Sequence, residues 1–404
     1  MKRLLHFSIL IILLNLCFLF SPKPTSDTNF CGEYIPLNSS AGFIRNCDAT
    51  EFLESAIYPS ALMRKNYVRQ NRPLYVVTAS FVGYGIYYIS TIFESVFTLS
   101  LNKSIYIAYV FLNFTILLLA LYLFEKIALK VTDGKISYLA VLMLSVFIAS
   151  NFMTKAFFWT AHQQMFAFLM PLLSVYICLK FIREQSMKML YTICFLLGIG
   201  MLIYGSFLIL FVACMLYLVY LHYKSKTLLT VHTIAFFVKA GLLFIVPTFV
   251  WIFFLKMNGV EYYNHEVVRY RQIVWMLDAL LVSPTELFAA VYYNITLFIP
   301  TVYKLLFFIG LVIIVYVFRL YHRSSVVSSL DVNLLVLNLI CFSIFFIFLG
   351  YYAYRLTFTL MPIMLCLAVA NMGTLLASKK NQLILFSLVC VWHVYNVLSY
   401  GPFS

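Results

Sequence analysis

Apolar runs long enough to cross a lipid bilayer follow one another along almost the whole chain. A hydrocarbon core of about 30 Å needs roughly 20 apolar residues in a helix, and this 404-residue chain is 64% hydrophobic and only 10% charged. A water-soluble fold of this size cannot bury so much apolar surface. The runs also lack the period-two alternation of transmembrane β-barrel strands. The sequence therefore predicts an all-α integral membrane protein, with apolar runs at 4–20, 74–93, 105–124, 136–152, 164–181, 189–204, 206–222, 233–256, 286–320, 332–350, 355–376 and 382–399.

The surplus of basic residues indicates how these helices are oriented. The formal net charge is +14, but the charges lie in short clusters between apolar runs, so we expect no nucleic-acid partner. Short cytoplasmic loops are rich in Lys and Arg. With a cytoplasmic N-terminus, an external C-terminus and eleven crossings, the short outer connectors hold only the cations Lys155 and Arg355. We therefore expect about 11 transmembrane helices in a single transmembrane domain, 1–404.

Three runs decide this count. We expect 74–93 to be a re-entrant or juxtamembrane helix that does not cross, because a crossing there would move the later cations to the outer side. A single helix over 189–222 would be about 51 Å long at 1.5 Å per residue, which favours a hairpin that turns at Gly205. The run 286–320 is expected to cross once, with a break at Pro300.

Two long external segments follow from this topology, 21–104 and 257–285. In the first, Asp48, Glu51 and Glu54 recur at helical spacing. A carboxylate at the membrane face can act as a general base, so Asp48 and Glu51 are candidate catalytic residues. The alternative is that Asp48 only caps a helix whose first turn favours acidic residues.

Basic residues follow these acids and recur in the second external segment. Arg69, Arg72, Arg269 and Arg271 could pair with phosphate oxygens. Arg355 stands at the outer end of a predicted span, where a charge is costly and therefore a functional candidate. The alternatives are solvated side chains, contacts with anionic headgroups and, for Arg355, snorkelling.

Two histidines lie in external connectors and are candidate acid/base groups or ligands. His162 follows an aromatic-rich stretch, and its alternative role is structural. His265 lies on one stripe of an expected amphipathic helix on the outer surface, formed by Glu261, His265, Arg269 and Gln272.

Cys31 and Cys47 are the two cysteines of nine that lie on the predicted outer side. They either form a disulfide just before Asp48 or remain free thiols. No CxxC or His/Cys cluster of the sequence indicates a zinc site.

In this arrangement the chain resembles the GT-C class of membrane glycosyltransferases, as a divergent member. The resemblance rests on an inner N-terminus, on Asp48 in a long first external loop, on Arg72-Pro73-Leu74-Tyr75 after it, and on Arg355 with Pro362 on a late helix. It implies a GT-C-like fold and a polyprenyl-phosphate-linked sugar as donor. It also implies membrane lipids as partners and a place in the plasma membrane, the bacterial inner membrane, with an extracytoplasmic active site.

The chain departs from the class in two places. Many members carry a second acid in the next external loop that helps to bind a divalent cation, Mg²⁺ or Mn²⁺, but here only His162 or Gln163 could take its place. The basic-Pro-Pro element of the class has one proline here, Pro73. Metal dependence is therefore left open by the sequence.

A mechanism follows for a membrane glycosyltransferase that moves a sugar to an extracytoplasmic glycan or lipid. Asp48 would be the base, Arg355 would hold the lipid phosphate, and Arg69 or Arg72 would order the loop. The alternatives are an O-antigen-type polysaccharide polymerase and a lipid-glycan flippase or transporter. The last predicts charges at mid-membrane and internal repeats, and no repeat is evident in the sequence.

Overall fold

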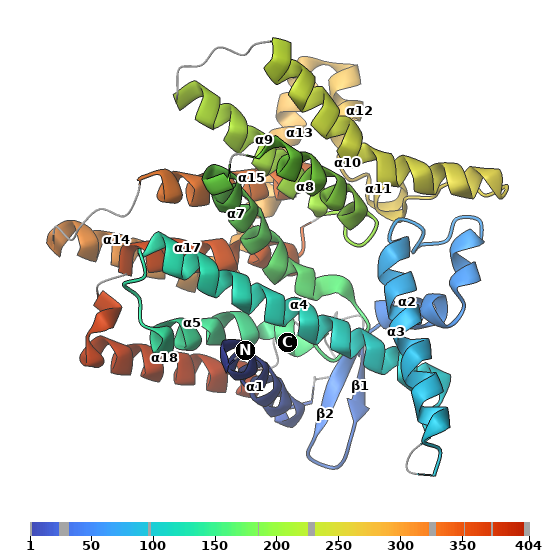
Figure 1. Ribbon diagram of the computed structural model, residues 1–404, viewed down its shortest axis with the longest axis horizontal. Coiled ribbons are helices and arrows are strands. Elements are labelled where there is room, and N and C mark those ends of the chain that lie inside the picture. The colour runs from blue at the N-terminus through green and yellow to red at the C-terminus, as the bar shows by residue number, and fades with distance from the viewer. Residues whose placement is uncertain are drawn as a thin grey trace.

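The computed structural model describes residues 2–23, 32–95, 98–184, 186–224, 231–322, 329–350, 352–372 and 375–399 (Figure 1). Its α-helices are α1 (Lys2–Cys17), α2 (Asp48–Ile57), α3 (Pro73–Ile92), α4 (Leu101–Val131), α5 (Tyr138–Ala149), α6 (Phe152–Phe157), α7 (Phe166–Glu184), α8 (Met187–Met201), α9 (Phe207–Lys224), α10 (Val231–Met257), α11 (His265–Tyr270), α12 (Val274–Val282), α13 (Pro284–Phe298), α14 (Leu306–His322), α15 (Ser329–Leu349), α16 (Tyr354–Thr357), α17 (Met361–Met372) and α18 (Lys379–Leu398). Short 3-10 helices cover Phe18–Phe20, Pro59–Met63, Gln163–Met165, Ile299–Leu305, Phe358–Leu360 and Leu375–Ala377. Two strands, β1 (Gly32–Pro36) and β2 (Gly42–Asn46), complete the described part of the chain.

The helices confirm the membrane class that the apolar runs predict. Among the described residues, ten helical stretches are long and apolar enough to cross a bilayer, and α5 and α8 are shorter apolar helices. α7 and α17 are the most buried of the long stretches, whereas α10 and α18 expose most of their apolar side chains. Apolar side chains on the outer surface of a helix bundle are expected where lipid is the solvent. The count of eleven crossings and the side that each loop faces stay predictions.

Two of the three runs that decide this count are broken where the sequence predicts a break. α8 and α9 are joined by a short turn at 202–206 and pack as a hairpin, in which Gly200 lies against the Phe207 ring. The run 286–320 is interrupted near Pro300: α13 ends at Phe298, and the 3-10 helix Ile299–Leu305 separates it from α14. Both breaks lie where the length limit and the proline place them.

The third run forms α3, which lies crosswise over the beginning of α4 (Figure 1). The Tyr75 and Tyr109 rings are 5.3 Å apart. Further along, a Cβ on Gly83 would come within 2.8 Å of the Ile105 Cα atom. The two backbones therefore touch at Gly83, and the residues before α3 are held over the end of the helix bundle. The prediction that this run does not cross remains a prediction.

The segment 21–104, predicted to be external, also contains a β-hairpin, which the sequence does not predict. β1 and β2 pair antiparallel from Gly32 opposite Asn46 to Pro36 opposite Gly42. The turn is set by Asn38, whose Oδ1 accepts hydrogen bonds from Ser40 N at 2.8 Å and Ala41 N at 2.7 Å. Strands of five residues in a segment dominated by helical signals leave little periodicity to detect.

Contacts between distant helices respect the predicted sides of the membrane. Several polar contacts join two ends that are both predicted inside: Arg3 with Glu125, Gln382 with Ser137, and Asn333 with Tyr220. The segments predicted outside meet instead around one large cavity.

Candidate active site

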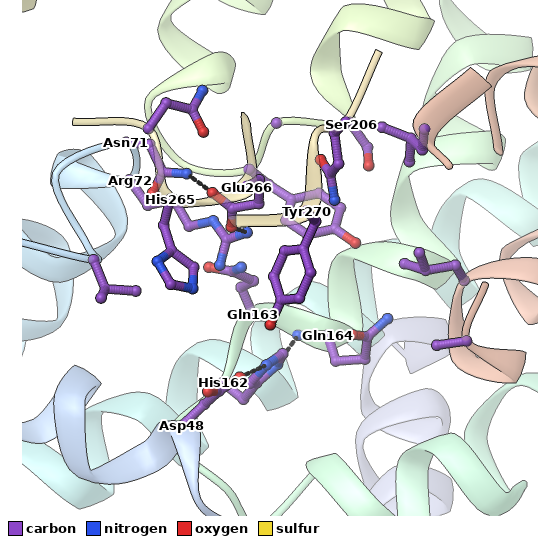
Figure 2. A pocket seen from close by; sticks show the side chains of 18 of the residues that line it. Asp48, Asn71, Arg72, His162, Gln163, Gln164, Ser206, His265, Glu266 and Tyr270 are labelled. Atoms are coloured by element: carbon purple, nitrogen blue, oxygen red, sulfur yellow. Dashed lines mark hydrogen bonds and ion pairs between the residues drawn. The ribbon is translucent and has the colours of Figure 1, made fainter. Parts of the chain in front are cut away.

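A cavity of about 1110 Å³ opens where the predicted external connectors converge (Figure 2). Its lining comes from chain segments that are far apart in sequence, within 46–72, 152–164, 201–208, 262–273 and 345–356, together with Thr248 of α10. The charged residues among the described lining are Asp48, Glu51, Glu266, Arg69, Arg72, Arg269 and Arg355. The structure thus brings most of the predicted site residues into one space, Asp48 and Arg355 included.

The first turn of α2 presents two acids to this cavity. Asp48 opens the helix, and its backbone N–H donates to Asn46 Oδ1 at 3.0 Å. Glu51 lies about one turn later and also lines the cavity. Glu54 does not line the cavity, and its carboxylate pairs with Arg64 at a distance of 2.6 Å. The helical spacing predicted for the three acids is confirmed, and only the first two face the site.

Arg69 joins the two acids. Its Nη2 atom lies 3.2 Å from Asp48 Oδ1 and 2.8 Å from Glu51 Oε2. The guanidinium carbon lies 4.1 Å from the centre of the Phe52 ring, and Arg69 is only 3% exposed. A buried charge needs such partners, so the positive charge of Arg69 is already balanced by protein carboxylates.

His162 lies against the same carboxylate. Its Nε2 atom is 3.4 Å from Asp48 Oδ2, and its Nδ1 atom accepts a hydrogen bond from the Gln164 backbone N–H at 3.1 Å. Because Nδ1 accepts, the ring proton is on Nε2 and points at Asp48. Burial lowers the pKa of His162 to about 4, although the hydrogen bond to Asp48 opposes this shift. The imidazole is therefore neutral at physiological pH.

The charge state of Asp48 follows from these neighbours. Burial alone would raise the pKa of its carboxyl group, but the hydrogen bond from His162 and the charges of Arg69 and Arg355 outweigh burial. The pKa of Asp48 is therefore held well below its usual range. The side chain is ionised, and 38% of it remains exposed to the cavity.

Glu266 links the segment 257–285, also predicted to be external, to the residues just before α3. Its carboxylate accepts hydrogen bonds from both Arg72 and Asn71. The Gln163 amide, with its oxygen facing the guanidinium, accepts from Arg72 Nε at 3.0 Å. Gln70 adds a second link, because its side-chain oxygen accepts from the Tyr263 backbone N–H at 2.9 Å. These contacts join the residues just before α3 to the residues around α11.

Arg355 lines another wall of the cavity. It belongs to the short helix α16, and its guanidinium carbon lies 5.8 Å from the centre of the Phe157 ring. Arg269 lines the cavity as well, near the Tyr270 ring. In the described part of the chain, no carboxylate lies within 4.0 Å of either guanidinium. Both cations are therefore available to an anionic ligand.

Arg271 and His265 have different surroundings. Arg271 is exposed, pairs with Asp278 and is not part of the cavity lining. His265 lines the cavity, with its Nδ1 atom 3.3 Å from the Tyr263 hydroxyl, and burial lowers its pKa. Of these two predicted site residues, only His265 lies near the Asp48 site.

The amphipathic helix expected over Glu261–Gln272 is wrong in its length. α11 contains only His265–Tyr270. Asn264 caps its start by accepting from the Val267 backbone N–H at 3.3 Å, and Arg271 ends it in the left-handed conformation at φ 51°. A cap and a left-handed residue limit a helix more strongly than apolar periodicity extends it.

The structure decides the state of Cys47, which the sequence leaves open between a disulfide and a free thiol. Cys47 is disulfide-bonded, and it directly precedes the first residue of α2. Cys31, its expected partner, lies outside the described residues. A cross-link at Cys47 anchors the start of the helix that carries Asp48.

A divalent cation does not fit the donor atoms around Asp48. Asp48 Oδ1 and Glu51 Oε2 both face the Arg69 guanidinium, so a cation bound to them would meet a positive charge. The Nδ1 lone pair of His162 is engaged by the Gln164 backbone, and its Nε2 carries a proton. Mg²⁺ or Mn²⁺, which the sequence leaves open, is therefore assigned no step in the proposed reaction.

Several site residues were not predicted from the sequence. Glu266 contacts both Arg72 and Asn71, and Gln164 orients His162. Gln163, which the sequence suggests only as a replacement for the second acid of the class, completes the contacts around Arg72. Glu266 is adjacent to the predicted stripe at His265, and the two glutamines follow His162 directly. Proximity to a candidate residue was the one signal available for them.

Comparison with known protein families, curated proteins and solved structures finds no match to the chain.

Proposed function

We propose that the protein is a membrane glycosyltransferase that uses a polyprenyl-phosphate-linked sugar. One observation carries the proposal: an ionised carboxylate, Asp48, lines the same cavity as Arg355, a guanidinium with no carboxylate partner in the described part of the chain. The reaction needs both groups, one beside the attacking hydroxyl and one beside the leaving phosphate. The GT-C-like fold, the plasma-membrane location and the extracytoplasmic active site belong to the same proposal.

The bond changes follow from the two groups. The acceptor oxygen attacks the anomeric carbon of the donor, and the bond from that carbon to the phosphate oxygen breaks. The acceptor proton passes to Asp48, and polyprenyl phosphate leaves with the bonding electron pair. Because phosphate is a good leaving group, a weakly basic carboxylate suffices: it orients the hydroxyl and receives its proton as the new bond makes that proton acidic.

The charge of the cavity fits a monophosphate donor. With His162 and His265 neutral, the described lining carries one more guanidinium than carboxylate. A sugar joined to a lipid by one phosphate is a phosphodiester with a single negative charge. A pyrophosphate donor would bring more negative charge than the cavity has in excess. The balance supports an uncharged sugar on a single phosphate.

The four cavity arginines then divide into two roles. Arg69 and Arg72 are paired with carboxylates, so their contribution is to hold the walls in place. Arg355 and Arg269 supply the charge that binds the donor phosphate, through hydrogen bonds stronger than those between neutral groups. Membrane lipids surround the apolar helices and deliver the polyprenyl chain.

The test uses purified protein in proteoliposomes with radiolabelled polyprenyl-phosphate hexoses and pentoses. Glycans and lipids extracted from the expressing cells serve as acceptors. The wild type is expected to transfer label, and Asp48→Asn to lower kcat by about 10²- to 10⁴-fold. The control is Glu54→Gln, on the same helix but outside the cavity, which should leave transfer unchanged.

Three results would contradict the proposal. Wild-type rates in Asp48→Asn would remove Asp48 from the chemistry. Donor that crosses the bilayer without being consumed would favour a flippase. Transfer confined to glycans carried on lipid pyrophosphate would favour a polysaccharide polymerase.

A further inference from the structure

We propose that His162 is a positioning residue: its neutral ring donates a hydrogen bond that holds the Asp48 carboxylate in place. His162 and Arg69 together orient this carboxylate, as a divalent cation would otherwise do. This inference rests on the proposed transfer reaction. It differs from the roles that the sequence suggests for His162, acid/base group or metal ligand.

The backbone fixes the state of the His162 ring. His162 precedes the 3-10 helix Gln163–Met165, and its Nδ1 atom accepts from the Gln164 N–H at the start of that helix. A backbone amide cannot lose its proton, so Nδ1 must stay unprotonated and Nε2 must carry the hydrogen. The donor that faces Asp48 Oδ2 at 3.4 Å is thus specified by the fold.

Packing fixes the direction of the ring. His162 is 3% exposed, with its ring centre 4.8 Å from that of Phe157 and 5.8 Å from that of Phe52. The Phe52 ring also lies under the Arg69 guanidinium. One aromatic residue therefore supports both groups that contact Asp48. The ring cannot swing away to accept a proton from a substrate in the cavity.

Together the two residues hold both oxygens of the carboxylate. Arg69 contacts Oδ1 and His162 contacts Oδ2, and 38% of the Asp48 side chain stays exposed beside them. The remaining lone pairs are left for the acceptor hydroxyl. A bound cation would normally perform this orientation, and here two hydrogen-bond donors perform it with one positive charge.

Three kinetic variants test the positioning role in the transfer assay. The terminal amide of His162→Gln can donate to Asp48 as Nε2–H does, so kcat should stay within about threefold of the wild type. His162→Phe keeps the ring but not the donor, and kcat should fall about 10- to 100-fold while the KM for the donor stays unchanged. If His162 were an acid/base group or a metal ligand, His162→Gln and His162→Phe would lose kcat to the same extent. Arg64→Gln is the control, because Arg64 pairs with Glu54 outside the cavity.

The outcomes separate the two proposals. A His162→Phe enzyme with wild-type kcat, or a His162→Gln enzyme as slow as His162→Phe, overturns the positioning role. A wild type without any transfer contradicts the proposed function instead. Gel filtration and the thermal midpoint show whether each variant folds.

Metal binding gives a measurement that is independent of activity. Electron paramagnetic resonance of Mn²⁺ titrated into the purified wild type should show no stoichiometric bound ion, and chelation should leave transfer unchanged. One tightly bound Mn²⁺ per chain that Asp48→Asn abolishes would overturn the inference. This measurement tests whether a divalent cation binds at Asp48 even if His162→Phe does not fold.

Discussion

The wall that α2 contributes to the cavity pairs every charge it carries, whereas the wall that α16 contributes carries a guanidinium with no carboxylate partner among the described residues. Asp48 and Glu51 share Arg69, while Arg355 lies near the Phe157 ring. Paired charges fix geometry but provide little binding energy for a further ion. An unpaired charge costs stability until an anion arrives. The difference suggests that one wall orients a reacting group and the other binds the donor.

Arg355→Ala is the variant that should disturb this division most. It removes a charge-assisted contact of about 1.5–3 kcal/mol to the donor phosphate, so the Kd for polyprenyl phosphate should rise about 10- to 100-fold. The measurement is titration of polyprenyl phosphate into purified protein. Arg271→Ala is the matched control, because Arg271 is exposed and paired with Asp278 outside the cavity. Equal affinities in wild type and Arg355→Ala would contradict the assignment of Arg355.

Glu266→Gln tests whether the second external segment must stay fastened. The change removes the charge that faces Arg72 and Asn71 but keeps a side chain of the same size. We expect kcat to fall by up to about tenfold, since Glu266 orders the segment without contacting the reacting atoms. Proteolysis within 257–285 should become faster. If kcat falls as far as it does in Asp48→Asn, Glu266 takes part in the chemistry.

The smallest effect concerns stability as pH falls. The pKa of His162 is lowered from 6.5 to about 4 by burial, so the unfolded chain binds a proton that the folded chain refuses. Stability from this group is complete above pH 6.5 and declines as the pH falls towards 4. Between pH 7 and 5, the thermal midpoint of the wild type should drop about 1–3 °C more than that of His162→Gln. Identical drops would show that His162 titrates normally.

The fold follows from the sequence more completely than the site does. Helix length, Pro300 and the distribution of cations are local signals, and they place the α8–α9 turn and the break after α13 correctly. The β-hairpin and the short α11 depend on single residues, Asn38 and Arg271, whose turn-forming conformations compete with periodicity.

The site depends on contacts between distant segments. Asp48, Arg355 and His162 are each an unusual residue in its own stretch, and only the resemblance to a known class assigns Asp48 and Arg355 to one site. Their convergence required the three connectors to meet, and no spacing within one stretch encodes that. The bond from the Gln164 backbone that sets the tautomer of His162 is likewise a property of the folded chain.

The contact between Gly83 and Ile105 has a consequence for how this protein can vary. Gly83 lies about 16 Å along the helix from Arg72, at 1.5 Å per residue. Even one methyl group on Gly83 would meet the α4 backbone. A displaced α3 would move Arg72 and Asn71 away from Glu266, although no residue of the cavity is substituted. Gly83 thus controls the distance between the segments 21–104 and 257–285, and substitutions that abolish the proposed activity need not lie in the cavity.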